Sequence, residues 1–419
     1  MDNRFNNLFG LTEDEAIALL DAPTDQIGEG NSRYSAAAHL INFSTERSIQ
    51  ALIRAVQNTD DALDNRIVRR KSVESLGRLK ATQAIPVIRS CLGESDCYTV
   101  ENAVWALGEI GTEDPEILED MAQLLTTPNQ TYRVIIQTLA KLHYPPAIDR
   151  IRPFTYHEEG PIASAAIAAI CRLSQDNRDM VKVLEFLQHS NVYTRRLCIQ
   201  DLMDAGYRES IPAITKCPVS LVFRLRGIRT LAQPNATKPK MVFAEIQADL
   251  EAVLRDHPQS LEFVHEYDQP PSLEFLIREL YETDFGRCYL ATQTLIDHHA
   301  DTAGPALIAT YQAEAHNDYG ANYHVIKTLG WLKYAPAYEI FLEGLHRTEP
   351  QFQKSRTAAA IALGELGDKR AIPELQCCLE SQIWDLKYAS LMALEALGDT
   401  EGKAIAAQDE DWLIQAKLQ

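Results

Sequence analysis

The chain has 419 residues and a formal net charge of −19, because 59 Asp and Glu outnumber 40 Lys and Arg. This balance argues against nucleic-acid binding, which needs clustered cations. No run of eighteen apolar residues occurs, so we expect no membrane span and a cytoplasmic protein. The start, MDNRFNNLFG, lacks the basic start and the apolar stretch of a signal peptide.

The first predicted helices are LTEDEAIALLDA at 11–22, expected to cap the N-terminal end, and SRYSAAAHLINF at 32–43. A Leu-Gly pair or its equivalent then recurs at steps of 31, 32, 31, 32 and 29 residues, marking Gly77, Gly108, Ala140, Cys171, Met203 and Ala232. Further copies fall near Val264, Ile296, Gly330, Gly364 and Gly398. A fixed period of this size is typical of a solenoid.

Each period carries two helices. In the last copy, Ile372, Leu375 and Leu379 form one apolar stripe with helical spacing, and residues 386–397 form the next. One such hairpin cannot bury its apolar face alone, so neighbouring hairpins must stack. The sequence therefore predicts an all-α fold, a right-handed and crescent-shaped α-solenoid of about twelve helical pairs.

The repeat is least regular between residues 233 and 286. QPNATKPK at 233–240 predicts a loop, residues 241–257 a helix, and the Pro270-Pro271 pair a stop. We interpret this stretch as deformed repeats and a bend. The predicted organisation is an N-terminal arm at 1–232, irregular repeats at 233–286 and a C-terminal arm at 287–419.

The sequence excludes several kinds of catalytic site. Eight cysteines occur without a CxxC pair or a Cys–His spacing suited to zinc, which indicates free thiols and no metal site. The motifs of serine hydrolases, dinucleotide enzymes and P-loop ATPases are absent. The remaining candidates are polar and aromatic side chains on the second helix of each pair, which usually lines the inner, binding face of a solenoid.

Counted back from the Leu-Gly position, residues −11, −7 and −3 share one helix face because they are four apart. In three successive N-terminal repeats this face carries Arg66, Arg70 and Glu74, then Cys97, Glu101 and Trp105, then Asn129, Arg133 and Gln137. Stacking should bring Arg70, Glu101 and Arg133 into one row. This row is either a recognition strip or a surface ladder in which the three side chains pair with one another.

The segment HNDYGANYHVIKTLGW at 316–331 is the densest set of groups able to stack or transfer protons. Its expected inner face carries Tyr319, Tyr323 and Lys327, with Asp318, His324 and Trp331 beside it. The alternative is a structural helix with solvated polar residues. We favour function, because a structural helix would use Ala, Glu and Lys, and because a glycine near its start lowers the helix propensity.

Some of these phrases resemble a known family. VENAVWALGEIG at 100–111 and ALGELGDKRAIPEL at 362–375 resemble the HEAT-like repeats named after phycobilisome lyases. Three N-terminal segments are more telling: the one at 11–56, LDNRIVRRKSVESLGRLKA at 63–81 and DCYTVENAVWALGEIGT at 96–112. They resemble the E/F-type phycobilin lyases, and most of all the long single-chain members that serve phycoerythrin.

The resemblance implies a cyanobacterial lyase that binds an open-chain tetrapyrrole, phycoerythrobilin, and attaches it through a thioether to a cysteine of a phycoerythrin α subunit. Some relatives also isomerise the pigment to phycourobilin; the sequence does not separate a lyase from a lyase-isomerase, and we favour the latter. The bilin is then the substrate, and no cofactor is expected. The alternative is a non-catalytic HEAT-repeat scaffold whose inner face grips only a protein.

The chemistry of a bilin matches the side chains on offer. Its two propionates suit Arg70 and Arg133, and its pyrrole N–H groups suit Glu101 or Asp318. Trp105, Tyr323 and Trp331 supply flat apolar walls, and Lys327 completes the binding set. Attachment and isomerisation both move protons, for which we predict Asp318 and Tyr319 as an acid/base pair and His324 as an alternate acid.

Overall fold

The computed structural model describes residues 10–23, 32–234 and 239–419, and these residues form helices without a β-strand. The chain divides into two compact units, Met1–Met180 and Val181–Gln419. Within the described ranges, no helix is both long enough and apolar enough to cross a membrane. The prediction of an all-α fold built from helical pairs is confirmed.

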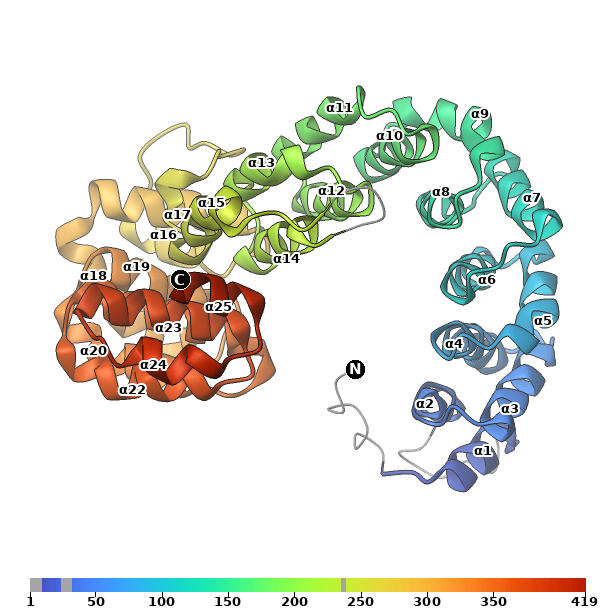
Figure 1. Cartoon of the computed structure of the whole chain (residues 1–419), viewed down its shortest axis with the longest axis horizontal. Helices are drawn as coiled ribbons and strands as arrows, with labels where there is room; N and C mark the ends of the chain where they lie inside the picture. The colour runs from blue at the N-terminus through green and yellow to red at the C-terminus, as the bar shows by residue number, and fades with distance from the viewer. Residues whose placement is uncertain (1–9, 24–31, 235–238) are drawn as a thin grey trace. The chain divides into compact units, whose positions relative to one another are not determined.

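The N-terminal unit alternates the two helices of each pair. In Figure 1, α2, α4, α6 and α8 follow one another as one row, and α3, α5, α7 and α9 form the second row beside it. The helices are α1 (Glu13–Asp21), α2 (Arg33–His39), α3 (Glu46–Gln57), α4 (Leu63–Arg78), α5 (Ile85–Ser90), α6 (Cys97–Ile110), α7 (Pro115–Gln123), α8 (Tyr132–Lys141), α9 (Ile148–Ile151) and α10 (Gly160–Ser174).

The C-terminal unit continues with helical pairs. Its helices are α11 (Met180–Glu185), whose first residue belongs to the N-terminal unit, α12 (Val192–Asp204), α13 (Ile211–Lys216), α14 (Leu221–Ala232), α15 (Phe243–Arg255), α16 (Leu273–Glu279), α17 (Phe285–His298), α18 (Ala300–Thr310), α19 (Ala321–Trp331), α20 (Tyr338–His346), α21 (Gln353–Leu366), α22 (Ile372–Cys377), α23 (Trp384–Leu397), α24 (Gly402–Ile405) and α25 (Trp412–Leu418). A single π-helical turn, Tyr311–Ala315, follows α18.

The recurring glycine has a packing reason. A Cβ atom added to Gly77 would lie 2.7 Å from the Cα of Ala106 on the next layer, and one added to Gly364 would lie 2.7 Å from the Cα of Ala393. Any larger residue would therefore push the second helices of neighbouring pairs apart. Gly367 has a separate role, since it ends α21 in the left-handed conformation at φ 78°.

The irregular stretch follows the predicted elements. Helix α15 lies within the helix predicted at 241–257, and residues 261–271, which include the proline pair, contain no helix. Part of the predicted loop, residues 235–238, lies outside the described residues. The predicted domain boundaries at 232 and 286 stay a prediction. The two compact units of the structure have their boundary between residues 180 and 181.

Candidate functional site

The first candidate region is the row predicted on α4, α6 and α8. The Arg70 guanidinium donates from Nε to Asp96 Oδ2 at 2.7 Å and from Nη2 to Oδ1 at 2.6 Å. Asp96 also caps α6 by accepting the backbone N–H of Thr99. Arg70 therefore joins α4 to the start of the next second helix, and its partner is Asp96 rather than Glu101.

Arg133, on α8, makes a contact of the same kind two layers further on. Its Nη1 donates to the carbonyl of Pro161, which lies in the first turn of α10. The −7 arginines thus bridge successive layers, which is a structural role that the sequence did not predict. Whether they also hold a carboxylate ligand stays a prediction.

Glu101 differs from both arginines. It is half-buried on α6, and no hydrogen bond or ion pair to its carboxylate is found among the described residues. Burial raises the pKa of this carboxyl above its usual value. A partly desolvated carboxyl without a protein partner is able to accept N–H groups or to carry a proton for a ligand.

Trp105 lies one turn beyond Glu101 on the same helix. Its ring edge would be 3.0 Å from a Cβ atom at Gly77, so the indole packs across the groove between α4 and α6. The Arg78 guanidinium lies 5.9 Å from the centre of this ring. An acid, an indole face and a cation therefore follow one another along the α4–α6 surface.

Two tyrosines extend this surface, and sequence reasoning missed them because they lie off the −11, −7, −3 register. Tyr98 on α6 is 56% exposed, with the Arg70 guanidinium 4.8 Å from its ring centre. Tyr34 on α2 is 42% exposed, with Lys71 Nζ at 5.1 Å. The signal that would have found them is an exposed aromatic next to a cation of the neighbouring layer.

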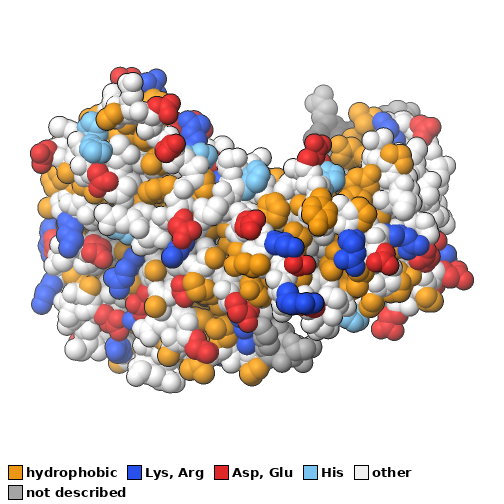
Figure 2. Space-filling view, turned by 90° about the horizontal axis from the view of Figure 1, so that it is seen from above, with side chains coloured by type: hydrophobic (Ala, Val, Ile, Leu, Met, Phe, Trp, Pro, Cys, Tyr) orange, Lys and Arg blue, Asp and Glu red, His pale blue; other side chains and the backbone are white. Residues whose placement is uncertain are grey.

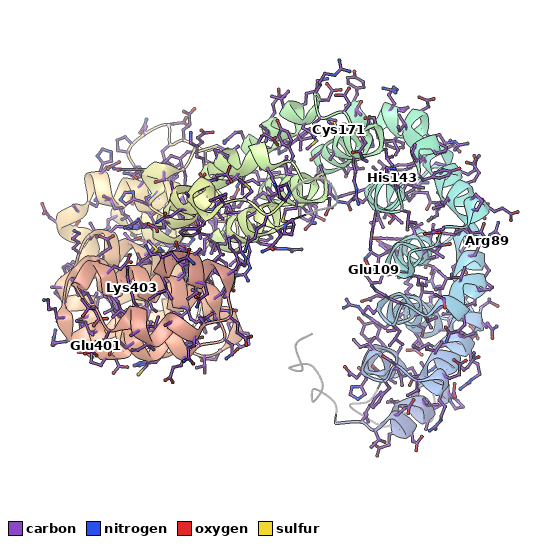
Figure 3. All side chains as sticks on the ribbon, viewed as in Figure 1. Arg89, Glu109, His143, Cys171, Glu401 and Lys403 are labelled. Carbon is purple, nitrogen blue, oxygen red and sulfur yellow. The ribbon has the colours of Figure 1, made fainter. Side chains whose placement is uncertain are left out.

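We call Tyr34, Arg70, Lys71, Arg78, Tyr98, Glu101 and Trp105 the N-terminal strip. Side chains of the second row face elsewhere: Arg89, on α5, donates to Asp120 of α7 at 2.8 Å (Figure 3). Acidic and basic groups are interspersed over the face of the molecule shown in Figure 2. The strip is therefore distinguished by its interleaved aromatic rings and cations and by its unpaired acid, rather than by charge alone.

The second candidate region, in the C-terminal unit, is built around a residue that the sequence did not indicate. Asp256 ends α15 in the left-handed conformation and is fully buried. Its carboxylate pairs with Arg224 and accepts hydrogen bonds from the hydroxyls of Tyr289, at 2.7 Å, and Tyr323. One buried acid thus connects α14, α15, α17 and α19.

Lys327 and Trp331 bind the same end of α15. Lys327 Nζ donates to the carbonyls of Leu254 and Arg255, both at 2.9 Å, and the Trp331 indole N–H donates to Arg255 at 3.4 Å. These bonds satisfy carbonyls that a helix leaves free at its C-terminus. Burial lowers the pKa of Lys327 to about 8.

The structural premise for Tyr323 and Lys327 is therefore wrong. We expected an open inner face, but both side chains are completely buried because the end of α15 packs against that face of α19. Neither can contact a ligand in this conformation. Their predicted role in binding has no direct support from the geometry.

The predicted catalytic residues lie in three different environments. Asp318 Oδ1 accepts the backbone N–H groups of Gly320 and Ala321 at 2.8 and 2.7 Å, at the start of α19. Tyr319 is 52% exposed. His324 is fully buried among aromatic rings, neither of its ring nitrogens has a partner among the described residues, and burial holds its pKa well below the usual value. A neutral, buried His324 suits the predicted acid role poorly, whereas Asp318 and Tyr319 remain at the surface end of the helix.

Comparisons with known proteins place the chain in a family. Residues 61–140 match the family "HEAT repeats", and residues 32–58 and 355–381 match "PBS lyase HEAT-like repeat". The "Uncharacterized phycocyanin operon protein Y" of Pseudanabaena tenuis (strain PCC 7409) is 60% identical over 417 residues, which cover 100% of this chain and 99% of that protein. The "Bilin biosynthesis protein CpeY" of Synechococcus sp. (strain WH8020) is 34% identical over 91% of this chain and 93% of its own length.

The chain belongs to the E/F-type phycobilin lyases. The fold agrees: the complex of CpcE and CpcF of phycocyanin lyase from Nostoc sp. PCC7120 superposes with a TM-score of 0.50 at 24% identity, covering 60% of this lyase and 99% of that chain. The resemblance inferred from the repeats is confirmed, and the alternative of a non-catalytic scaffold loses its support. The assignment of individual site residues in the lyase stays a prediction.

Proposed function

We propose that this bilin lyase attaches phycoerythrobilin to a cysteine of a phycoerythrin α subunit in the cytoplasm, and that it isomerises the pigment to phycourobilin in a separable second step. The bilin biosynthesis protein CpeY, similar over 91% of the chain, supports bilin chemistry. The name of the 60% identical relative refers to a phycocyanin operon, so a phycocyanin subunit is the acceptor that competes with phycoerythrin.

The observation that carries the proposal is the unpaired acid of the N-terminal strip. Glu101 is half-buried, has a raised pKa, and lies one turn from the face of Trp105. A linear tetrapyrrole offers a row of pyrrole N–H donors on a flat conjugated surface. Glu101 would accept those N–H groups while Trp105 and Tyr98 pack on the flat surface. Lys71 and Arg78 both pair with Glu74 on α4, so a propionate would have to replace that carboxylate to bind them.

The attachment step needs a proton donor but no oxidant. The cysteine sulfur of the acceptor forms a bond to the ethylidene carbon of the bilin, and the exocyclic double bond becomes a single bond. The thiol gives up its proton, and the bilin receives one proton in return. Isomerisation removes a proton at one carbon and returns it at another, which again leaves the oxidation state unchanged. Asp318 and Tyr319 are the predicted donor and acceptor, since both lie at the surface end of α19.

Co-expression in a bilin-producing host tests the proposal. The lyase is expressed with a phycoerythrin α subunit or, in parallel, with a phycocyanin α subunit, and a lyase-free culture gives the background. We expect a covalently coloured phycoerythrin subunit on denaturing gels, with absorbance that reports phycourobilin. If only the phycocyanin subunit becomes coloured, phycocyanin is the acceptor instead. If the attached pigment still absorbs as phycoerythrobilin, the lyase has no isomerase activity. No colour above background would contradict the proposal.

A further inference from the structure

Lys354, the second residue of α21, is a buried lysine whose amine has no hydrogen-bonding partner among the described residues. Its side chain is 3% exposed, and Nζ makes no hydrogen bond among the described residues. Buried charges in proteins are normally paired, because removal from water is strongly unfavourable. The position is unfavourable in a second way, since the N-terminal turn of a helix carries a positive partial charge. Burial and the helix N-terminus therefore each disfavour a positive charge on Lys354.

The surroundings of Lys354 compensate only weakly. Its Nζ lies 3.1 Å from the ring centre of Tyr319, 4.5 Å from that of Phe285 and 5.6 Å from that of Tyr323. Aromatic faces attract a cation, but much less than a carboxylate does in a desolvated site. Burial lowers the pKa of Lys354 to about 7; Cys288 and Asp318 oppose this shift, and the charge of Arg196 adds a smaller contribution in the same direction as burial.

Two further nitrogen donors near this lysine are also without partners. His324, whose ring lies 4.5 Å from that of Phe285, uses neither ring nitrogen, and Nε of Arg196 is buried without an acceptor. Asp318, the carboxylate whose charge acts on Lys354, already accepts two backbone N–H groups of its own segment through Oδ1. Lys354 Nζ and Arg196 Nε are therefore two buried nitrogen donors without an acceptor among the described residues, and together they would suit a bound anion.

Tyr319 separates the cation from solvent. Phe285 and Tyr323 are 1% and 0% exposed, whereas Tyr319 is 52% exposed, and no hydrogen bond to its hydroxyl is found among the described residues. A rotation of this one surface side chain would uncover Lys354, while movement of the other two rings would require the core to open. The π-helical turn at Tyr311–Ala315, just before this segment, is a kind of distortion that occurs often at functional sites.

We propose that Lys354 anchors a propionate carboxylate of the bilin, and that the side chain of Tyr319 covers the lysine until the pigment arrives. The inference rests on the proposed function, because the ligand is the lyase's own substrate. A carboxylate fits because it is a single, compact negative charge attached to a flat apolar body that the aromatic cage and Tyr319 can contact. The anchor would also hold the pigment beside Asp318 and Tyr319, the predicted proton-transfer pair.

The test compares phycoerythrobilin with its dimethyl ester, which has the same pigment but no carboxylates. Spectroscopic titration of the purified full-length lyase should show the free acid binding at least tenfold more tightly than the ester. In Lys354→Met, affinity for the free acid should fall about tenfold while affinity for the ester stays the same. Lys333→Met is the matched control, because that lysine is 65% exposed in its side chain and should behave as the wild type.

A second measurement uses the wild type and does not depend on the folding of a variant. Limited acetylation followed by mass spectrometry should modify Lys354 slowly in the wild type and faster in Tyr319→Ala, and the free acid should protect Lys354 whereas the ester should not. If the wild type binds bilin but Lys354→Met binds the free acid as tightly as the wild type does, or if neither form protects Lys354, the anchor is overturned and the lyase function stands. If the wild type binds neither form, the proposed function fails with it.

Discussion

The two candidate regions use the same residue types in opposite ways. In the N-terminal strip, Arg70 pairs with Asp96 at the surface end of a layer, and Glu101 has no partner in the part of the chain that the structure describes. In the C-terminal unit, Arg224 and Asp256 are completely buried and share their bonds with two tyrosines. The strip is therefore free to exchange partners with a ligand, while the Asp256 network holds four helices together. Lys354 is one exception in the C-terminal unit, because it is buried like the network and, among the described residues, has no hydrogen-bonding partner.

The largest expected effect is on stability, and it distinguishes the buried Asp256 network from the N-terminal strip. In Asp256→Asn, the new side chain has the shape of the old one, and Asn tolerates the left-handed backbone conformation. The substitution nevertheless leaves Arg224 as a buried charge without a carboxylate. We expect about 3–5 kcal/mol loss in the free energy of unfolding, measured by chemical denaturation. Asp96→Asn is the matched control, because Asn still caps α6 and the pair with Arg70 is partly solvated, so about 0–1 kcal/mol is expected. Equal losses in the two variants would remove the distinction between the regions.

The next effect concerns chemistry at the start of α19. Asp318→Asn still accepts backbone N–H groups and Tyr319→Phe loses only a hydroxyl without a partner, so melting temperatures should stay near that of the wild type. Removal of a general acid or base typically lowers a rate by about a hundredfold or more. Single-turnover bilin transfer and isomerisation are therefore measured for both variants. Wild-type rates in both would exclude this pair as the proton-transfer residues.

The titration of Lys354 should be visible in how the free energy of unfolding changes with pH. The folded pKa of Lys354 is about 7 and lies below the value in an unfolded chain, so the unfolded state binds more protons above that pH. Stability should accordingly rise between pH 6 and pH 9 by an amount on the order of 2 kcal/mol from this residue. Lys354→Met should remove that part of the slope and be the more stable protein at pH 6. A variant slope equal to the wild-type slope would show that the lysine does not titrate in this range.

A smaller effect is expected on pigment affinity in the strip. Glu101→Gln should weaken bilin binding by about tenfold, because a charged acceptor of pyrrole N–H groups becomes a neutral one. Glu109→Gln, on the same helix, is the control (Figure 3): its carboxylate is already engaged by Lys141 at 2.7 Å, so affinity should not change. Arg70→Ala should change affinity less than Glu101→Gln, since Asp96 already holds that guanidinium. Unchanged affinity in Glu101→Gln would assign the strip to packing or to contact with the acceptor protein.

The sequence predicted the repeated architecture because packing at one position recurs every layer. Gly77 and Gly364 touch the backbone of the following second helix, and that constraint leaves a visible mark in each copy. The helix at 241–257 and the break at Pro270-Pro271 were likewise readable from local patterns. Such features depend on neighbours close in sequence or on a period, and both can be read without a structure.

The candidate site was predictable only in part. Tyr323 and Lys327 have the spacing of an open face, but the helix end that covers them is 67 to 73 residues away in the chain and belongs to the one irregular stretch. A contact between segments so far apart in the chain leaves no repeating pattern in the sequence. Lys354 was missed for the opposite reason: in the sequence QKSRTAAAIALGEL it looks like an ordinary solvated lysine at the start of a helix. Its burial follows from three rings contributed by two other helical segments.

Three arginine contacts made from α2, α4 and α8 share one direction along the array. Arg33 reaches Asn65 at the start of α4, Arg70 reaches Asp96 at the start of α6, and Arg133 reaches Pro161 at the start of α10. Each bond runs from one repeat to its C-terminal neighbour, as in a head-to-tail polymer whose subunits are not interchangeable. At these three junctions, shuffling or deleting a repeat should therefore be tolerated only where the arginine before the junction meets an acceptor after it. The growth of this array by internal duplication would have had to copy each donor together with the acceptor of the following repeat.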